Sequence, residues 1–160
     1  MKCLNLVLLL LMISFNSIGQ TNDIARAKDE ERIKKVLTDF TDAWNKHDAK
    51  AFSNVFSEDA DFTNVVGKGS TGPNEIEKFH APGFSTRWKD SYQKITQSKI
   101  RFIKPDVAAV DAWWEMTGIK GPEGQDMQQR KGLLNFIITK NNETWLITIM
   151  HNMDLPISQK

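Results

Sequence analysis

The second half of the sequence contains a run of strand patterns, and this run restricts the fold more than any other feature. Apolar and polar residues alternate with a period of two in four segments: residues 92–103, 107–117, 128–140 and 144–154. Pro105-Asp106 and Asn141-Asn142-Glu143 form two of the turns, and a glycine-rich loop begins at Gly118. Strands that follow one another through short turns pair antiparallel, so we expect a meander in a single sheet.

The first half of the chain is predicted to be mainly helical. Helical spacing of apolar residues covers residues 23–46, and a short second helix follows at 49–56. A strand is predicted at 59–66, and a third helix begins near Thr71 and ends at Pro82-Gly83. Helices that precede a meander cover one face of it, so the predicted class is α+β. We expect a strongly curved, cone-shaped antiparallel sheet wrapped around the helices, with a cavity between them.

Residues 1–19 are typical of a secretory signal peptide. Lys2 gives a positive start, Leu4 to Phe15 is almost wholly apolar, and Ser17-Ile18-Gly19 supplies small residues at the cleavage site. We expect cleavage after Gly19, with an uncleaved membrane anchor as the alternative. The apolar run is short for a membrane span, so no membrane contact is expected after cleavage.

The expected cleavage defines the domain organisation. Residues 20–29 would extend the first helix, residues 30–154 would form one domain, and residues 155–160 a C-terminal tail. Cleavage would remove Cys3, the single cysteine, and with it any thiol nucleophile or disulfide. An exported chain without disulfides is more typical of a bacterial periplasm or exterior than of a eukaryotic lumen.

Charge and motifs exclude several classes of function. The chain has 21 Lys plus Arg against 20 Asp plus Glu and no basic cluster, so we expect no nucleic-acid partner. Gly67, Gly69 and Gly72 have the spacing of a dinucleotide-binding loop, but no parallel strand–helix–strand unit surrounds them. We therefore interpret them as a turn and expect no cofactor.

Polar residues at predicted inward positions are the candidates for chemistry. Asp61 and Asn64 lie three apart on a strand, so they would face opposite sides, one pointing into the cavity and the other anchoring the adjacent loop. Asn64 is a candidate to orient a bound ligand. His80 shares a helix face with Ile76. In a regular strand, His151 would share a face with Trp145, Ile147 and Ile149, because every second residue points the same way. We expect His80 and His151 to line one cavity, where Asp61 and the two histidines would be the catalytic residues. The alternatives are structural roles: Asp61 would cap or bridge at the start of the strand, and the histidines would be buried core residues with their hydrogen bonds made.

The remaining site candidates would bind rather than react. Arg130 begins a strand and would hold a ligand at the cavity mouth, or pair with a surface carboxylate. Trp44 and Trp114 would form the cavity wall or the core. No pair of candidate ligands has the i, i+2 or i, i+4 spacing of a metal motif, so no metal site is predicted.

Several of these segments resemble a known family. Ala43 to Phe52 and Phe56 to Val65 resemble the opening of the SgcJ/EcaC family, which lies in the SnoaL-like group of the nuclear transport factor 2-like superfamily. Later segments agree with that family in order and spacing: Ile76 with His80, Arg101-Phe102, Pro105 to Ala108, Trp114 with Gly118, Arg130 to Gly132, Trp145 with Ile147, and His151-Asn152. The resemblance covers about residues 30–154. It implies a cone-shaped α+β barrel, usually a homodimer, and it adds Asn152 to the ligand-binding candidates.

Three functions are compatible with these features. The first is a SnoaL-like enzyme that acts on a small hydrophobic molecule by general acid–base chemistry, as in an isomerisation, cyclisation or hydration. The family is often labelled oxidoreductase, but the sequence has no cofactor motif for that chemistry. The second is a binding module for a small apolar molecule, and the third is an association domain. We also predict a homodimer through the outer sheet face, where apolar residues recur: Trp113, Val107, Ile137, Leu146 and Met150.

Overall fold

The computed structural model describes the backbone of residues 2–156 and the side chains of residues 23–156. Met1 and residues 157–160 of the predicted tail lie outside this part. The elements are α1 (Lys2–Asn45), α2 (Ala49–Ser53), β1 (Phe56–Thr63), β2 (Gly69–Thr71), α3 (Gly72–Phe84), β3 (Tyr92–Lys104), β4 (Val107–Thr117), β5 (Arg130–Asn141) and β6 (Thr144–Asp154). The predicted signal peptide falls on the first part of α1, where no side chain is described.

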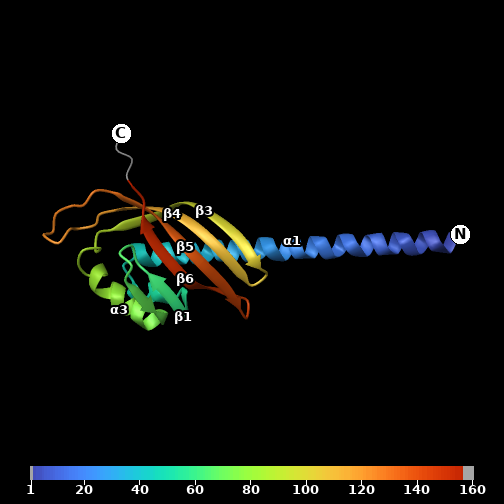
Figure 1. The fold of residues 1–160 in the computed structure, drawn as a ribbon, viewed down its shortest axis with the longest axis horizontal. Coiled ribbons are helices and arrows are strands. Elements are labelled where there is room, and N and C mark those ends of the chain that lie inside the picture. Colours follow the sequence, from blue (N-terminus) through green and yellow to red (C-terminus); the bar gives the residue numbers. More distant parts are fainter. Residues whose placement is uncertain (1, 157–160) are drawn as a thin grey trace.

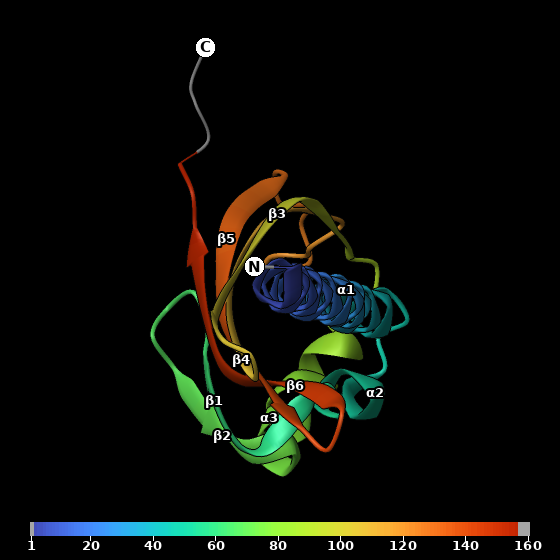
Figure 2. The same cartoon turned by 90° about the vertical axis from the view of Figure 1, so that its right-hand side faces the viewer.

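One six-stranded sheet has the strand order β2-β1-β6-β5-β4-β3. The pairs from β3 to β6 are antiparallel, and β1 joins β6 in parallel. The sheet curves around α1, with α2 and α3 closing one side, and α1 continues beyond the sheet (Figures 1 and 2). The predicted α+β fold with a curved sheet around N-terminal helices is therefore confirmed.

The alternating pattern of β4 shows why the sheet packs as it does. Ala108, Val110, Ala112, Trp114 and Met116 are all buried, and the residues between them are half-buried. Because side chains alternate between the faces of a strand, this row faces the helices. Ile33, Val36, Leu37 and Phe40 of α1 recur at helical spacing and form the facing part of the core.

A buried ion pair fixes α1 to the end of the sheet. The Asp29 carboxylate accepts hydrogen bonds from Lys140 Nζ at 2.8 Å and from Trp145 Nε1 at 3.0 Å. Arg32 Nη1 reaches Asp29 at 3.2 Å and Glu143 at 2.6 Å. Burial raises the pKa of Asp29, but the hydrogen bonds from Lys140, Trp145 and Arg32 outweigh it, so the pKa lies below its usual value.

A bulge in β6 changes which side chains face the helices. Ile147 pairs with Ile138 and Ile149 with Ile137, so Thr148 is an extra residue with no partner of its own. An extra residue moves every later side chain of the strand to the opposite face of the sheet. As a result Met150 is buried on the helix side, and His151 is exposed.

Two expectations about β6 are therefore wrong. His151 does not share a face with Trp145 and Ile147, and Met150 is not on the outer face. Strand β2 was not predicted, because its three residues are too few to show a period-two pattern; it pairs with the end of β1. In the part of the chain that the structure describes, no helix is long and apolar enough to cross a membrane.

Candidate functional site

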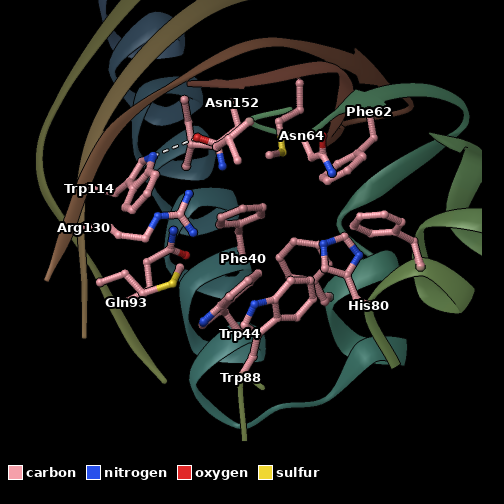
Figure 3. Close-up of a pocket in the computed structure, with 16 residues that line it drawn as sticks. Phe40, Trp44, Phe62, Asn64, His80, Trp88, Gln93, Trp114, Arg130 and Asn152 are labelled. Carbon is pink, nitrogen blue, oxygen red and sulfur yellow. Dashed lines mark hydrogen bonds between the residues drawn. The ribbon is translucent and has the colours of Figure 1, made fainter. Parts of the chain in front are cut away.

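A pocket of about 80 Å³ lies between the concave face of the sheet and the helices (Figure 3). Most of its lining is apolar, and much of that is aromatic. The lining residues are Phe40, Trp44, Phe52, Phe62, Asn64, Val65, Phe79, His80, Trp88, Gln93, Trp114, Met116, Arg130, Leu134, Met150 and Asn152. The titratable groups of this lining are the imidazole of His80 and the guanidinium of Arg130.

The volume limits what the pocket can hold. Its volume of about 80 Å³ is smaller than that of a cavity of about 150 Å³ that holds benzene. Pockets for drug-sized ligands usually measure about 300–1,000 Å³. Phe79 and Trp88 are the aromatic lining residues that are half-buried, whereas the other phenylalanine and tryptophan side chains of the lining are buried. The pocket therefore suits a small molecule, and a ring-sized one requires these two side chains to shift.

His80 is held in one tautomer. It is 2% exposed, and its Nδ1 lies 2.7 Å from the carbonyl oxygen of Ile76, one turn earlier in α3. A carbonyl only accepts hydrogen bonds, so Nδ1 must carry the proton. The neutral ring then presents an unprotonated Nε2 with a free lone pair.

Aromatic rings surround this imidazole. The ring centroids of Phe52, Phe79 and Phe62 lie 4.4, 5.0 and 5.1 Å from that of His80. Burial among them lowers the pKa of His80 to about 4, against a smaller opposing effect of the hydrogen bond to Ile76. At neutral pH the side chain is therefore an uncharged acceptor.

A second polar group lies across the pocket from His80 (Figure 3). Gln93 pairs in register with Met116, and Met116 pairs with Arg130, so the three form one row across β3, β4 and β5. All three line the pocket. Because neighbouring strands are about 4.8 Å apart, the long side chains of Gln93 and Arg130 flank Met116 and reach the same end of the pocket.

Arg130 pairs with a carboxylate and also lines the pocket. Its Nη2 donates to both oxygens of Asp154, at 2.6 and 2.7 Å, and its guanidinium lies 5.6 Å from the ring centroid of Trp114. The ion pair neutralises the charge, and the same side chain lines the pocket.

Trp114 and Asn152 form the wall next to Arg130. The indole Nε1 donates a 2.9 Å hydrogen bond to Oδ1 of Asn152. The six-membered part of the indole lies over Gly132, where a Cβ would collide with it. Only glycine fits at this position, which is the register partner of Trp114.

Asn64 lines the pocket and shapes the loop after β1. Its Oδ1 accepts from the backbone N–H groups of Val66 at 3.0 Å and Lys68 at 2.9 Å. This asparagine therefore has the loop-anchoring role that the sequence assigned to one member of the Asp61–Asn64 pair.

The structure separates the three residues predicted to be catalytic. His80 lies in the pocket with the ligand-binding candidates Trp44, Asn64, Trp114, Arg130 and Asn152. Asp61 points outward from β1 and is exposed, because it has the opposite parity to the buried Ala60 and Phe62. His151 is exposed because of the β6 bulge, so the expectation of two histidines in one cavity is wrong. Within the described residues, no three His, Cys, Asp or Glu side chains come together as a candidate metal site.

Sequence reasoning missed Gln93 as a site residue. It lies in the polar first half of the predicted strand, but it shares parity with Ile95, which pairs with Trp114. That parity was the available signal. Phe79 shares a face of α3 with Ile76 and His80, and that shared face was the available signal. Trp88 had no comparable signal, because it lies in the irregular segment before β3.

The family can now be given. A model of the SnoaL-like domain matches residues 37–133. The chain belongs to the SnoaL-like domain family. A search of curated proteins finds no match.

Solved structures agree with this fold. An uncharacterized protein with a cystatin-like fold from Caulobacter vibrioides has a TM-score of 0.73 and 23% identity, covering 79% of this chain and 89% of that one. The hexachlorocyclohexane dehydrochlorinase LinA-type3 from Novosphingobium barchaimii LL02 has a TM-score of 0.74 and 16% identity, covering 85% and 94%. A scytalone dehydratase-like protein from Novosphingobium aromaticivorans has a TM-score of 0.73 and 13% identity, covering 84% of this chain and 89% of that one. At these identities the likenesses show the cystatin-like, nuclear transport factor 2-like fold alone.

Proposed function

We propose that this SnoaL-like protein binds a small, mostly apolar molecule in its pocket and moves a proton on it with His80. The observation that carries the proposal is the arrangement of the imidazole: Nδ1 bonds to the Ile76 carbonyl, and the pocket is lined by the same side chain. A fixed tautomer leaves Nε2 as the basic atom, which is the requirement for a general base. No cofactor enters this proposal.

The proposed reaction is a proton transfer within a mostly apolar pocket. Nε2 would accept a proton from the substrate while the Ile76 carbonyl stabilises the resulting imidazolium through Nδ1. Return of the proton to another atom gives an isomerisation or cyclisation, whereas addition of water gives a hydration. The names of two structural neighbours, a dehydrochlorinase and a dehydratase-like protein, denote the related eliminations.

A non-catalytic binding module is the second candidate. It is favoured by the pocket lining, which within the described residues includes no Asp or Glu to pair with His80. A base with a pKa of about 4 is weak at neutral pH, whereas catalytic bases usually have pKa values near the working pH. The two candidates share the pocket and differ only in whether His80 accepts a proton from the ligand.

One experiment separates these candidates. Protein purified under native conditions is analysed by mass spectrometry for retained small molecules, in parallel with His80→Asn and His151→Asn variants. An enzyme that uses His80 converts the retained compound in the wild type and in H151N, and binds it unchanged in H80N. A binding module leaves the compound unchanged in all three proteins. Retention of no compound by the wild type would contradict both.

The finer assignments are also proposals. The motifs from Ala43 to Val65 support an SgcJ/EcaC-type member, and the leader at residues 1–19 supports export to a bacterial periplasm or exterior. N-terminal sequencing of the protein recovered from the periplasm or medium should find Gln20 at or near the start. Recovery of intact Met1 in the cytosol would contradict export.

A further inference from the structure

Gln93 has an unsatisfied polar atom in the pocket. The residue is 2% exposed, and its Oε1 is buried without a hydrogen-bond partner among the described residues. The backbone on either side of the side chain is fixed, because Asn45 donates to the Gln93 carbonyl and accepts from its N–H, both at 2.8 Å. These bonds fix the point from which the Gln93 side chain extends, and Oε1 lacks a donor that a bound molecule could provide.

Arg130 supplies the complementary group at the same end of the pocket. Nη2 is engaged by Asp154, and within residues 23–156 we find no hydrogen bond from Nε or Nη1. These N–H groups can donate to a ligand oxygen. Because Asp154 already balances the positive charge, an anionic ligand gains less here than at an unpaired arginine.

A hydroxyl group meets both requirements at once. It donates its hydrogen to Gln93 Oε1 and accepts from an Arg130 N–H. A carboxylate has no hydrogen to donate to Gln93 Oε1, and an ammonium group has no lone pair to accept a hydrogen bond from Arg130. The rest of the lining is apolar and largely aromatic, which suits a flat ring.

We propose that the pocket is a site for a small, neutral ring alcohol of the phenol or cyclohexanol class, with its hydroxyl held between Gln93 and Arg130. This inference rests on the proposed function, because it names the class of molecule that the pocket takes. The ring would lie between that end and His80, against Phe40 and Trp44 (Figure 3). Phe79 and Trp88 move outward to admit it, since the pocket of about 80 Å³ is smaller than a cavity of about 150 Å³ that holds benzene.

Three probes of similar size test the proposal: phenol, toluene and benzoate. Each is titrated into ¹⁵N-labelled protein, and the indole N–H signals are followed by NMR. Trp44, Trp88 and Trp114 line the pocket and should shift, whereas Trp113 and Trp145 lie outside it and serve as internal references. We expect phenol to bind about tenfold more tightly than toluene, and benzoate to bind more weakly than phenol.

A near-isosteric variant isolates the contribution of Gln93. Gln93→Leu removes a buried polar atom that has no partner, so the free protein should melt several degrees higher. The same change should remove the preference for phenol over toluene. The matched control is Gln97→Leu, at an exposed position of the same strand, where both the melting temperature and the preference should be unchanged. A purely structural Gln93 would leave the preference unaltered.

The outcomes distinguish this inference from the proposed function. If toluene binds as tightly as phenol, or if benzoate binds most tightly, the hydroxyl site is wrong but the apolar pocket stands. If Q93L retains the preference for phenol, the hydroxyl lies elsewhere and the inference is again wrong. If no probe shifts the three pocket indoles, the pocket accepts only water, and both the inference and the proposed function are contradicted.

Discussion

Trp114 donates its indole N–H to Asn152 across the pocket wall, at 2.9 Å, although the two residues are 38 positions apart in the chain. The contact exists because the extra residue Thr148 inverts the parity of β6 and turns Asn152, rather than His151, toward the pocket. The bulge is itself braced, since the hydroxyls of Thr148 and Thr139 lie 2.6 Å apart. A single inserted residue thus decides which polar group meets Trp114.

Asn152→Leu should therefore destabilise the protein. The substitution leaves the indole N–H of the buried Trp114 without an acceptor, at a cost of about 1–3 kcal/mol in the free energy of unfolding. Urea denaturation measures the loss. The neighbouring variant His151→Leu changes an exposed side chain and should alter stability by less than about 0.5 kcal/mol. A larger effect from H151L than from N152L would contradict the bulged register.

The sequence predicted most elements because their patterns are local. The alternation in β4 and the helical spacing from Ile33 to Trp44 each follow from one element packing one face on the core. The site was harder to predict, since parity holds only while a strand is regular. The bulge at Thr148 turns His151 away from the pocket and Asn152 toward it, and no residue type in that stretch indicates a bulge. Gln93 was missed because a buried, unsatisfied glutamine goes against the usual preference of polar residues for solvent.

Acid should destabilise the fold through His80. The pKa of His80 is about 4 in the folded state and 6.5 as the reference, so below pH 6.5 the unfolded state takes up a proton that the folded state does not. The stability associated with the neutral ring is complete above pH 6.5 and falls as the pH drops toward 4. Between pH 7 and pH 5 the loss is about 2 kcal/mol.

Urea titrations at pH 7 and pH 5 measure this loss in the wild type, His80→Asn and His151→Asn. Carboxylates titrate in all three proteins, so their contribution cancels in the comparison. H80N should lose about 2 kcal/mol less than the wild type on acidification, and H151N should behave like the wild type. Equal pH dependence in H80N and the wild type would show that His80 titrates normally.

Asp29→Asn should loosen α1 from the sheet. The carboxylate holds Lys140, Trp145 and Arg32 together, and its replacement leaves a half-buried lysine without its nearest charge partner. Removal of one member of a fully buried ion pair costs about 3–5 kcal/mol, and we expect about 2–3 kcal/mol here because Lys140 retains some solvent contact.

Thermal unfolding checks this loss, and Asp39→Asn is the control. Asp39 also pairs with a lysine, Lys35, but both side chains are largely exposed. Surface pairs of this kind contribute about 0–1 kcal/mol, so D39N should melt close to the wild type. Similar melting temperatures for D29N and D39N would mean that the Asp29 cluster does not anchor the helix.

Gly132→Ala should distort the pocket wall. A Cβ at this position would meet the indole of the buried Trp114 and the backbone carbonyl oxygen of Met153 in the neighbouring strand β6. Overpacking of this kind costs about 1–3 kcal/mol. Gly69→Ala is the control, because a Cβ at Gly69 would lie at an ordinary contact distance of 3.6 Å from the carbonyl oxygen of Phe62. The Trp114 indole NMR signal should move in G132A alone.

A homodimer through the outer face of the sheet remains our proposal for the assembly. Trp113, Val107, Ile137 and Leu146 are half-buried on that face, whereas Met150, the fifth residue expected there, is buried on the other side. Asn135 donates to Asp111 at 2.6 Å on the same face, which supplies a satisfied polar pair among these apolar residues. Apolar patches broken by satisfied polar groups are typical of interfaces between subunits.

Light scattering on the protein without residues 1–19 tests the dimer at micromolar concentration. We expect twice the mass of one chain for the wild type, and a shift to monomer in Trp113→Glu, because a charge at the centre of an apolar interface is desolvated without a partner. Ile103→Glu introduces the same charge at an exposed end of β3 and should remain a dimer. The pocket indole signals should be the same in both variants, since Trp113 lies on the face opposite the pocket. A wild-type mass of one chain, or a dimer that tolerates W113E unchanged, would place the interface elsewhere or remove it.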